Sequence, residues 1–314
     1  TAALMGSLAR PIYSQTAGTP AAVVPQERKG AAGINLVIFN EGRPGLLTER
    51  GVVDVSTLTR PLGGQDAMQV LITRYDELKP ELARLAAEGA AQPLSAVTLK
   101  APVPRAKVLA MGGNYREFGA RKPEPMWGFL KSTDALLGSG GTVVLPEVDA
   151  NIFHHEAELV VVFGRAGRNI PQAQAMDYVF GYTLENDMSD RGGRGDSRFG
   201  SDWLIGKNHD TFAPLGPFIT PKEFVRDVGN TGMKFVLNGT LLQEGTTAQM
   251  IHTVPEQIVY ASNILTLRPG DVIATGTPPG VGSARNPPIL LKAGDRMECS
   301  YDGVGTLINP VVAP

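Results

Sequence analysis

The sequence predicts a β-rich α+β protein whose main domain is a large β sandwich or barrel-like structure. Beyond about residue 107, many short apolar segments with strand character are separated by Gly and Pro turns. Helical patterns are confined to a few stretches, and no period of 20 to 50 residues repeats. The chain is 42% hydrophobic and 19% charged, as expected for a soluble globular protein that buries a large core.

Residues 1–33 form a separate N-terminal extension in this prediction. They lack sustained periodicity and contain Pro20, Pro25 and a charged stretch, as a tail or strap would. Their small, weakly apolar start allows two interpretations, the end of an export signal or a loose extension. We expect a cytoplasmic protein, with export after removal of a signal as the alternative.

Residues 34–100 are predicted to form a small α+β domain. Three strand-like segments, 34–40, 42–51 and 52–56, are separated by turns, and 75–90 is expected to be a helix that breaks or starts near Pro80. The Pro-rich segment 100–107 has the composition of a linker. The catalytic domain is then expected to span 101–314.

The domain 101–314 is predicted to contain many short strands and one clear helix. Asn238-Gly239 favours a type I′ hairpin, because both residues tolerate positive φ. The segment 255–266 begins with Pro and has apolar residues at helical spacing. The expected strands lie within 107–113, 141–146, 157–164, 180–187, 234–243, 271–278 and 295–309.

Charge and cysteine content exclude several classes of function. The formal net charge is -2 with no basic stripe, so we expect neither nucleic acid nor an anionic membrane surface as a partner. No apolar run approaches the roughly 20 residues that span a bilayer. Cys299 is the single cysteine, which excludes an intrachain disulfide and predicts a small buried apolar side chain. A small-molecule ligand is the expected partner.

Two pairs of acidic residues carry the strongest chemical signal. Glu156 and Glu158 are two apart in a strand-like segment, so both carboxylates are expected on one side of it. Glu185 and Asp187 repeat this spacing, and carboxylates held together repel unless a cation lies between them. Oxygen ligands without cysteine favour a hard cation such as Mg²⁺. The alternative is that Glu156 and Glu158 line the solvent face of a strand, with His154 beside them as a surface or supporting group.

The sequence resembles the fumarylacetoacetate hydrolase family over roughly residues 103 to 310. Eight collinear blocks carry the resemblance: MGGNYRE, WGFLKSTDALLGSGGTVVLP, HEAELVVVFGRAGRNI, VFGYTLENDMSDR, GKNHDTFAPLGPFI, VLNGTLLQEGTTAQMI, LTLRPGDVIATGTPPGVG and LKAGDRMECSYDGVGTLIN. It implies a mixed β-sandwich roll, a homodimer, and an Mg²⁺ or Mn²⁺ ion bound by Glu156, Glu158 and Asp187. It also implies that Lys207 holds the substrate or a catalytic water. The substrate-binding positions that it implies are Tyr115, Tyr182, Arg191 and Thr277.

The lid segment departs from the family pattern. In hydrolytic and decarboxylating relatives, a His is expected three residues after the Tyr of the Asn-Tyr pair and a Glu three further on. Here these positions hold Phe118 and Arg121, and Phe118 cannot move a proton. Glu117 and His154 are therefore the proposed catalytic substitutes, with Glu124 and His209 as further candidates. Arg116 and Arg121 indicate a second anionic group on the substrate, or simply solvated surface charge.

The leading functional hypothesis is a metal-dependent hydrolase that cleaves a C–C bond in a 2,4-dioxo acid of the acylpyruvate kind. A 2-oxo acid can chelate a metal through its carboxylate and keto oxygen, which stabilises an enolate. Two alternatives stay open at this stage. One is an isomerase, tautomerase or decarboxylase of an oxo-diacid from aromatic catabolism, and the other is a catalytically silent binding protein.

Overall fold

The computed structural model describes residues 33–60, 64–116, 125–147, 152–191 and 202–313. The N-terminal extension, the lid positions 117–124 and most of the Gly-rich segment after Arg191 lie outside these ranges.

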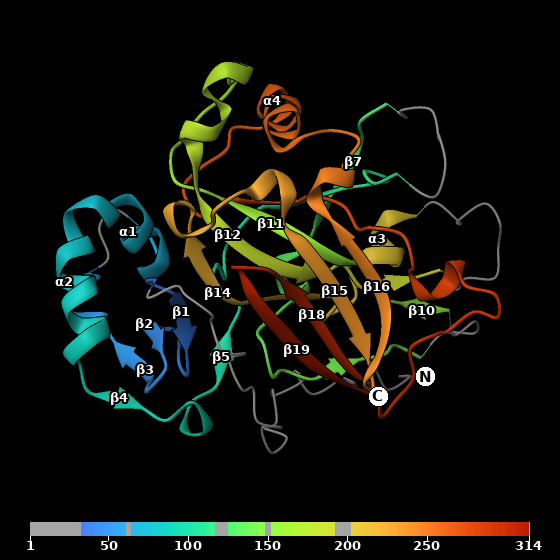
Figure 1. Ribbon diagram of the computed structural model, residues 1–314, viewed down its shortest axis with the longest axis horizontal. Helices are drawn as coiled ribbons and strands as arrows, with labels where there is room; N and C mark the ends of the chain where they lie inside the picture. Colours follow the sequence, from blue (N-terminus) through green and yellow to red (C-terminus); the bar gives the residue numbers. More distant parts are fainter. Residues whose placement is uncertain (1–32, 61–63, 117–124, 148–151, 192–201, 314) are drawn as a thin grey trace, which may run out of the picture.

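A mixed sheet of 12 strands forms the main layer of the molecule (Figure 1). Its order is β4-β3-β2-β1-β14-β12-β11-β17-β6-β7, with β5 beside β1 and β8 beside β14. Neighbouring strands are antiparallel except β17 with β6 and β14 with β8. The bounds of these strands are β1 Leu36–Phe39, β2 Arg43–Thr48, β3 Gly51–Asp54, β4 Ala91–Gln92, β5 Leu99–Lys100, β6 Val108–Met111, β7 Gly128–Lys131, β8 Leu136–Leu137, β11 Ala157–Phe163, β12 Val179–Asn186, β14 Ala213–Pro221 and β17 Val272–Ala274.

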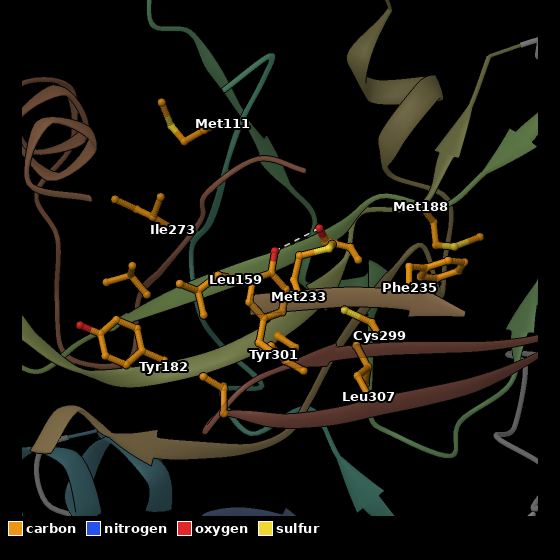
Figure 2. Packing of buried hydrophobic residues seen from close by; sticks show 14 of the residues in the cluster. Met111, Leu159, Tyr182, Met188, Met233, Phe235, Ile273, Cys299, Tyr301 and Leu307 are labelled. Atoms are coloured by element: carbon orange, nitrogen blue, oxygen red, sulfur yellow. Dashed lines mark hydrogen bonds between the residues drawn. The ribbon is translucent and has the colours of Figure 1, made fainter. Parts of the chain in front are cut away.

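A second sheet of five strands packs against this layer and closes the sandwich (Figure 2). Its order is β16-β15-β18-β19-β9, and β18 alternates strictly between partly exposed and buried residues, as a sheet covered on one face requires. Leu159 of the main sheet shares one apolar core with Phe235, Cys299 and Tyr301 of the second. The bounds are β9 Val143–Val144, β15 Gly232–Leu237, β16 Thr240–Thr246, β18 Arg296–Tyr301 and β19 Gly305–Val312, and a separate pair is formed by β10 Phe153–His154 and β13 Ser189–Asp190.

The fold class and most strand predictions are confirmed. Asn238 and Gly239 have φ values of 51° and 81°, as a type I′ turn between β15 and β16 requires. Cys299 is buried and free, as its isolation predicted. The strand β14 was missed because its Pro and Gly content is typical of a turn, yet it is buried along its whole length between β1 and β12.

Within the described ranges, the fold also contains four α-helices: α1 Ala67–Thr73, α2 Tyr75–Glu88, α3 Trp203–Lys207 and α4 Val254–Ile264. The helix α4 is confirmed and begins with a capping box between Thr253 and Glu256. The predicted break near Pro80 is wrong, because α2 runs through that residue without a new start. The preceding helix α1, capped by Asp66 and Gln69, was not foreseen.

The first strands join the main sheet directly, since β1 pairs with both β2 and β14. Ala101 and Val103, in the predicted linker, are buried in a core shared by the N-terminal helices and the central strands. The division at residue 100 therefore stays a prediction. In the part of the chain that the structure describes, no helix is long and apolar enough to cross a membrane. Homodimerisation and cellular location also stay predictions.

Candidate metal centre

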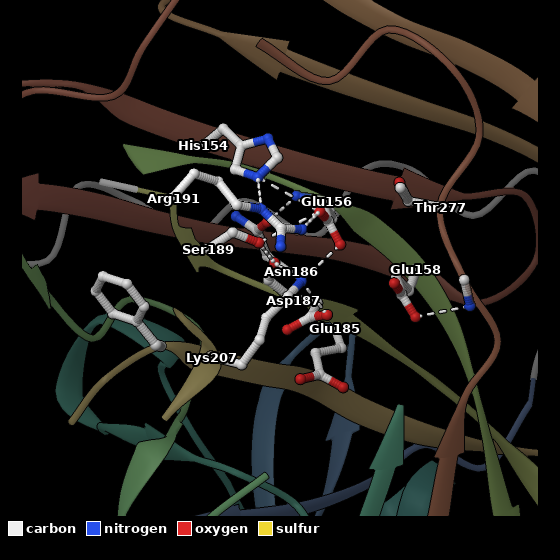
Figure 3. Close-up of polar contacts among 12 residues, drawn as sticks. His154, Glu156, Glu158, Glu185, Asn186, Asp187, Ser189, Arg191, Lys207 and Thr277 are labelled. Atoms are coloured by element: carbon white, nitrogen blue, oxygen red, sulfur yellow. Dashed lines mark hydrogen bonds and ion pairs between the residues drawn. The ribbon is translucent and has the colours of Figure 1, made fainter. Parts of the chain in front are cut away.

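Three carboxylates converge where β11 and β12 lie side by side (Figure 3). Glu156 directly precedes β11, Glu158 lies within it, and Asp187 directly follows β12. One carboxylate oxygen from each lies within 4.8 Å of the others. The backbone fixes this arrangement, because Asp187 N donates to Glu156 O at 2.8 Å and Glu156 N donates to Asn186 Oδ1 at 3.0 Å. The predicted acidic residues therefore form one cluster, and Glu158 and Asp187 are buried.

Two buried lysines face these carboxylates from outside the two strands. Lys207, the last residue of α3, places Nζ 2.7 Å from Glu156 Oε2 and 2.6 Å from Asp187 Oδ2. Lys131, the last residue of β7, donates to Asp187 Oδ1 and, at 2.9 Å, to the carbonyl oxygen of Phe212. Sequence reasoning missed Lys131, because a lysine at the end of the apolar run GFLK is usually solvated.

Arg191 and His154 border the cluster on the Glu156 side. Arg191 Nη2 lies 3.1 Å from Glu156 Oε1, and Arg191 Nε donates to His154 Nε2 at 3.1 Å. A guanidinium can only donate, so His154 Nε2 accepts and Nδ1 carries the proton toward Ser283 Oγ, 2.8 Å away. Burial is the main reason that the pKa of His154 falls to about 4, so its imidazole is neutral near pH 7.

The carboxylates differ in how their charge is compensated. Burial alone would raise the pKa of Glu156, but Lys207, His154 and Arg191 hold it at about 2. Burial, followed by the charges of Asp187 and Glu185, raises the pKa of Glu158 well above its usual value. Burial likewise raises the pKa of Glu185 to about 8, although Lys131 opposes the change. Negative charge at Glu158 is therefore costly unless a cation lies beside it.

The donor set fits a hard divalent cation. Among the residues that the structure describes, Glu158 pairs with no lysine or arginine, and Gly276 N donates to its Oε2 at 2.8 Å. Three convergent carboxylate oxygens without sulfur ligands are typical of Mg²⁺ and Mn²⁺ sites that retain open positions. The cluster could thus hold such an ion.

The loop after β17 is hydrogen-bonded to β11 next to Glu158. Thr277 Oγ1 donates to Ala157 O at 2.8 Å and accepts from Gln243 Nε2 at 2.9 Å. Gln243 also donates to the carbonyl oxygen of Pro278. It was not singled out from the sequence, where a glutamine within a strand gives no distinctive signal.

Three other predicted residues, Tyr115, Tyr182 and His209, differ in their relation to the carboxylates. Tyr115 is buried, and the charge of Glu158 contributes, after burial, to the raised pKa of its hydroxyl. Tyr182 lies in the apolar core with Leu159, where burial raises its pKa to about 12 (Figure 2). The structure therefore does not group Tyr182 with the acidic cluster. His209 pairs with Asp190 at 3.2 Å.

The lid candidates cannot be placed in this way. Glu117, Phe118, Arg121 and Glu124 lie outside the described residues. Their proposed roles stay predictions.

The two-sheet fold places an acidic, all-oxygen cluster beside two buried lysines, an arrangement found in enzymes and able to hold a divalent cation. Residues 107–312 match the model of the family described as "Fumarylacetoacetate (FAA) hydrolase C-terminal". The chain belongs to the fumarylacetoacetate hydrolase family. The resemblance inferred from the eight sequence blocks is confirmed.

Relatives within this family carry several activities in their names. A mitochondrial oxaloacetate tautomerase of Rattus norvegicus is 37% identical over 83% of this chain and 84% of its own length. A mitochondrial oxaloacetate tautomerase of Homo sapiens is 40% identical over 73% of this chain and 74% of its own. The structure of maleylpyruvate hydrolase from Sphingobium sp. SYK-6 with manganese(II) and pyruvate has a TM-score of 0.77, with 34% identity, covering 89% of this chain and 99% of that one. Hydrolase, isomerase and tautomerase activities are all represented among the similar proteins.

Proposed function

We propose that this protein is a divalent-metal-dependent tautomerase that interconverts the keto and enol forms of a short 2-oxo acid of the oxaloacetate type. The observation that carries the proposal is the similarity, at 37–41% identity, to oxaloacetate tautomerases over most of the chain. The sequence supports it, because Phe118 and Arg121 occupy the positions where a hydrolytic His and Glu are expected. Tautomerisation needs a proton to move and no water to be activated.

Glu156, Glu158 and Asp187 are the proposed ligands of an Mg²⁺ or Mn²⁺ ion. When bound, the ion would polarise the keto oxygen of the substrate and favour loss of the neighbouring proton. Lys207 and Arg191 hold Glu156 ionised and add positive charge beside it. With a divalent ion bound, the positive charges of the site would slightly outnumber those of its four carboxylates, which suits a substrate that carries a carboxylate.

His154 is the proposed proton carrier among the described residues. Its Nε2 lies 3.5 Å from Glu156 Oε1 and carries no proton, and it would release the hydrogen bond from Arg191 Nε when it accepts one. Lys207 is a poorer base: burial would lower its pKa, but Asp187 and Glu156 raise it overall. Glu117 remains the second candidate for this role, on sequence grounds.

Hydrolysis of a C–C bond in a 2,4-dioxo acid, the leading hypothesis from the sequence, is the second candidate function. It is favoured by the likeness to maleylpyruvate hydrolase over 89% of this chain. Its weakness is the missing His at position 118, for which Glu117 or His154 would have to substitute.

The test compares two reactions of the chelator-treated protein, with and without added Mg²⁺ or Mn²⁺. Enol–keto conversion of oxaloacetate and cleavage of acetylpyruvate are each followed by loss of enol absorbance, with metal alone as the blank. We expect metal-dependent conversion of oxaloacetate that is lost in Glu158→Gln, a variant of nearly the same shape. Metal-dependent cleavage of acetylpyruvate without oxaloacetate conversion would instead establish the second candidate.

A further inference from the structure

Three aromatic side chains lie next to the lysines of the acidic cluster. Trp203 and Phe129 stack with centroids 5.0 Å apart at an interplanar angle of 15°. Trp127 lies 4.9 Å from Trp203 and 6.2 Å from Phe129. We call Trp127, Phe129 and Trp203 the aromatic wall.

Local geometry links each part of the wall to a buried lysine. In β7, Phe129 and Lys131 are two apart and share a face, and Trp127 continues the same alternation just before the strand. In α3, Trp203 and Lys207 are four apart and also share a face. Each element therefore directs a lysine to the carboxylates and a ring to a position further from them.

The wall is continuous with the charged side of the site. The ring of Phe129 has its centroid 5.4 Å from Lys207 Nζ, and the guanidinium of Arg191 lies 5.3 Å from the centroid of Trp203. Both cations contact Glu156. The lysines are buried, whereas all three rings stay partly exposed.

Gly112 makes room for the wall. A Cβ atom at this position would lie 2.0 Å from two carbon atoms of the Trp127 ring. No β-carbon tolerates that distance, so the indole can occupy its place only because residue 112 is glycine.

We propose that the aromatic wall is a subsite for the distal part of the substrate, and that the site prefers 2-oxo acids carrying a planar aryl or conjugated group on the third carbon. This inference rests on the proposed metal-dependent function, because the cluster must hold the oxo-acid end. A ring on the third carbon is two C–C bonds, about 3 Å of bonded path, from the keto carbon. The far edge of that ring is about 5 Å from the keto carbon, which is comparable to the 5.4 Å between Lys207 Nζ and the centroid of Phe129.

Pyruvate and phenylpyruvate are the matched probes, because they share the chelating end and differ by the ring. Calorimetric titration of the full-length protein in saturating Mg²⁺ gives both affinities without C–C cleavage. We expect phenylpyruvate to bind roughly tenfold more tightly, as stacking against two aromatic rings would produce.

Two variants remove the preference by different routes. Trp203→Leu deletes the central ring, and Gly112→Ala displaces Trp127 without changing any charged residue. Each is expected to bring the ratio of the two affinities toward one. Leu204→Ala is the matched control, since Leu204 follows Trp203 in α3 but is 74% exposed.

The outcomes separate this inference from the proposed function. Equal binding of the two acids by the native protein, or an unchanged ratio in both wall variants, overturns the subsite while leaving the metal-dependent function standing. Failure of both acids to bind in the presence of Mg²⁺ overturns the subsite, whereas the proposed function is overturned only by loss of metal-dependent oxaloacetate conversion. A purely structural wall would lower the Tm of the variants without altering the affinity ratio.

Discussion

Two lysine–glutamate pairs in this molecule have the same length and opposite surroundings. Lys207 Nζ lies 2.7 Å from Glu156 Oε2 in the acidic cluster, and Lys79 Nζ lies 2.7 Å from Glu223 Oε2 at the surface of α2. The side chains of the first pair are 1% and 13% exposed, and those of the second are 44% and 36% exposed. Distance alone therefore does not tell how much either pair matters.

The difference lies in what replaces the partner when it is removed. Water and salt can solvate Lys79 or Glu223, so their attraction has little net effect on folding. Buried carboxylates near Lys207 have no such substitute, because desolvation has already removed the water. We infer that the buried lysines stabilise the carboxylate cluster, and that a bound metal ion would further reduce the repulsion among the carboxylates.

The largest expected effect is the loss of stability on replacing Lys207, and replacing Lys79 provides the comparison. Lys207→Met should lower the metal-free unfolding free energy by about 3–5 kcal/mol, because it leaves buried carboxylates unpaired. Lys79→Met should lower it by at most about 1 kcal/mol. Urea unfolding of both variants measures the contrast, and similar losses would show that burial does not distinguish the pairs.

A second prediction concerns Glu158, the carboxylate without a lysine or arginine partner among the described residues. Mg²⁺ at about 100 times its dissociation constant should stabilise the native protein by about 2.7 kcal/mol. Glu158→Gln should largely abolish this stabilisation, because it removes a charged ligand. It should not destabilise the metal-free protein, because burial and the neighbouring carboxylates already disfavour a charge at Glu158. Thermal unfolding with chelator and with Mg²⁺ measures both effects; a metal-induced rise in Tm equal to that of the native protein would exclude Glu158 as a ligand.

The same contrast explains which parts of the site could be predicted from sequence. Glu156, Glu158 and Asp187 could be predicted because their spacing and the strand period together place carboxylates side by side. Lys131 could not, because its partner Asp187 is 56 residues away and the two are brought together only by the tertiary fold, not by pairing of neighbouring strands. A lysine ending an apolar segment is indistinguishable, in sequence, from one at a solvated strand end.

The fold shows a similar division between local and long-range information. The hairpin at Asn238-Gly239 and the helix α4 follow from turn and capping chemistry within a few residues. The strand β14 depends on hydrogen bonds to β1 and β12, which outweigh its local turn-like composition. Pro80 lies in the second turn of α2, where it removes one backbone hydrogen bond, and the buried side chains of Leu78 and Leu82 on either side offset that loss.

The smallest expected change in unfolding free energy is that of the exposed pair, Lys79 and Glu223. Partial burial would raise the pKa of Glu223, but hydrogen bonds from Lys79 and Tyr75 hold it below 4.5. A carboxylate with a lowered folded-state pKa stabilises the protein above its unfolded pKa, and this contribution is lost as pH falls through the folded value. Glu223→Gln should therefore cost less than about 1 kcal/mol at pH 7, and the difference from the native protein should shrink below pH 4.5. Urea unfolding at the two pH values tests this: a difference that grows on acidification would mean that the hydrogen bonds of Glu223 stabilise its protonated form, and the surface pair would then not act through charge.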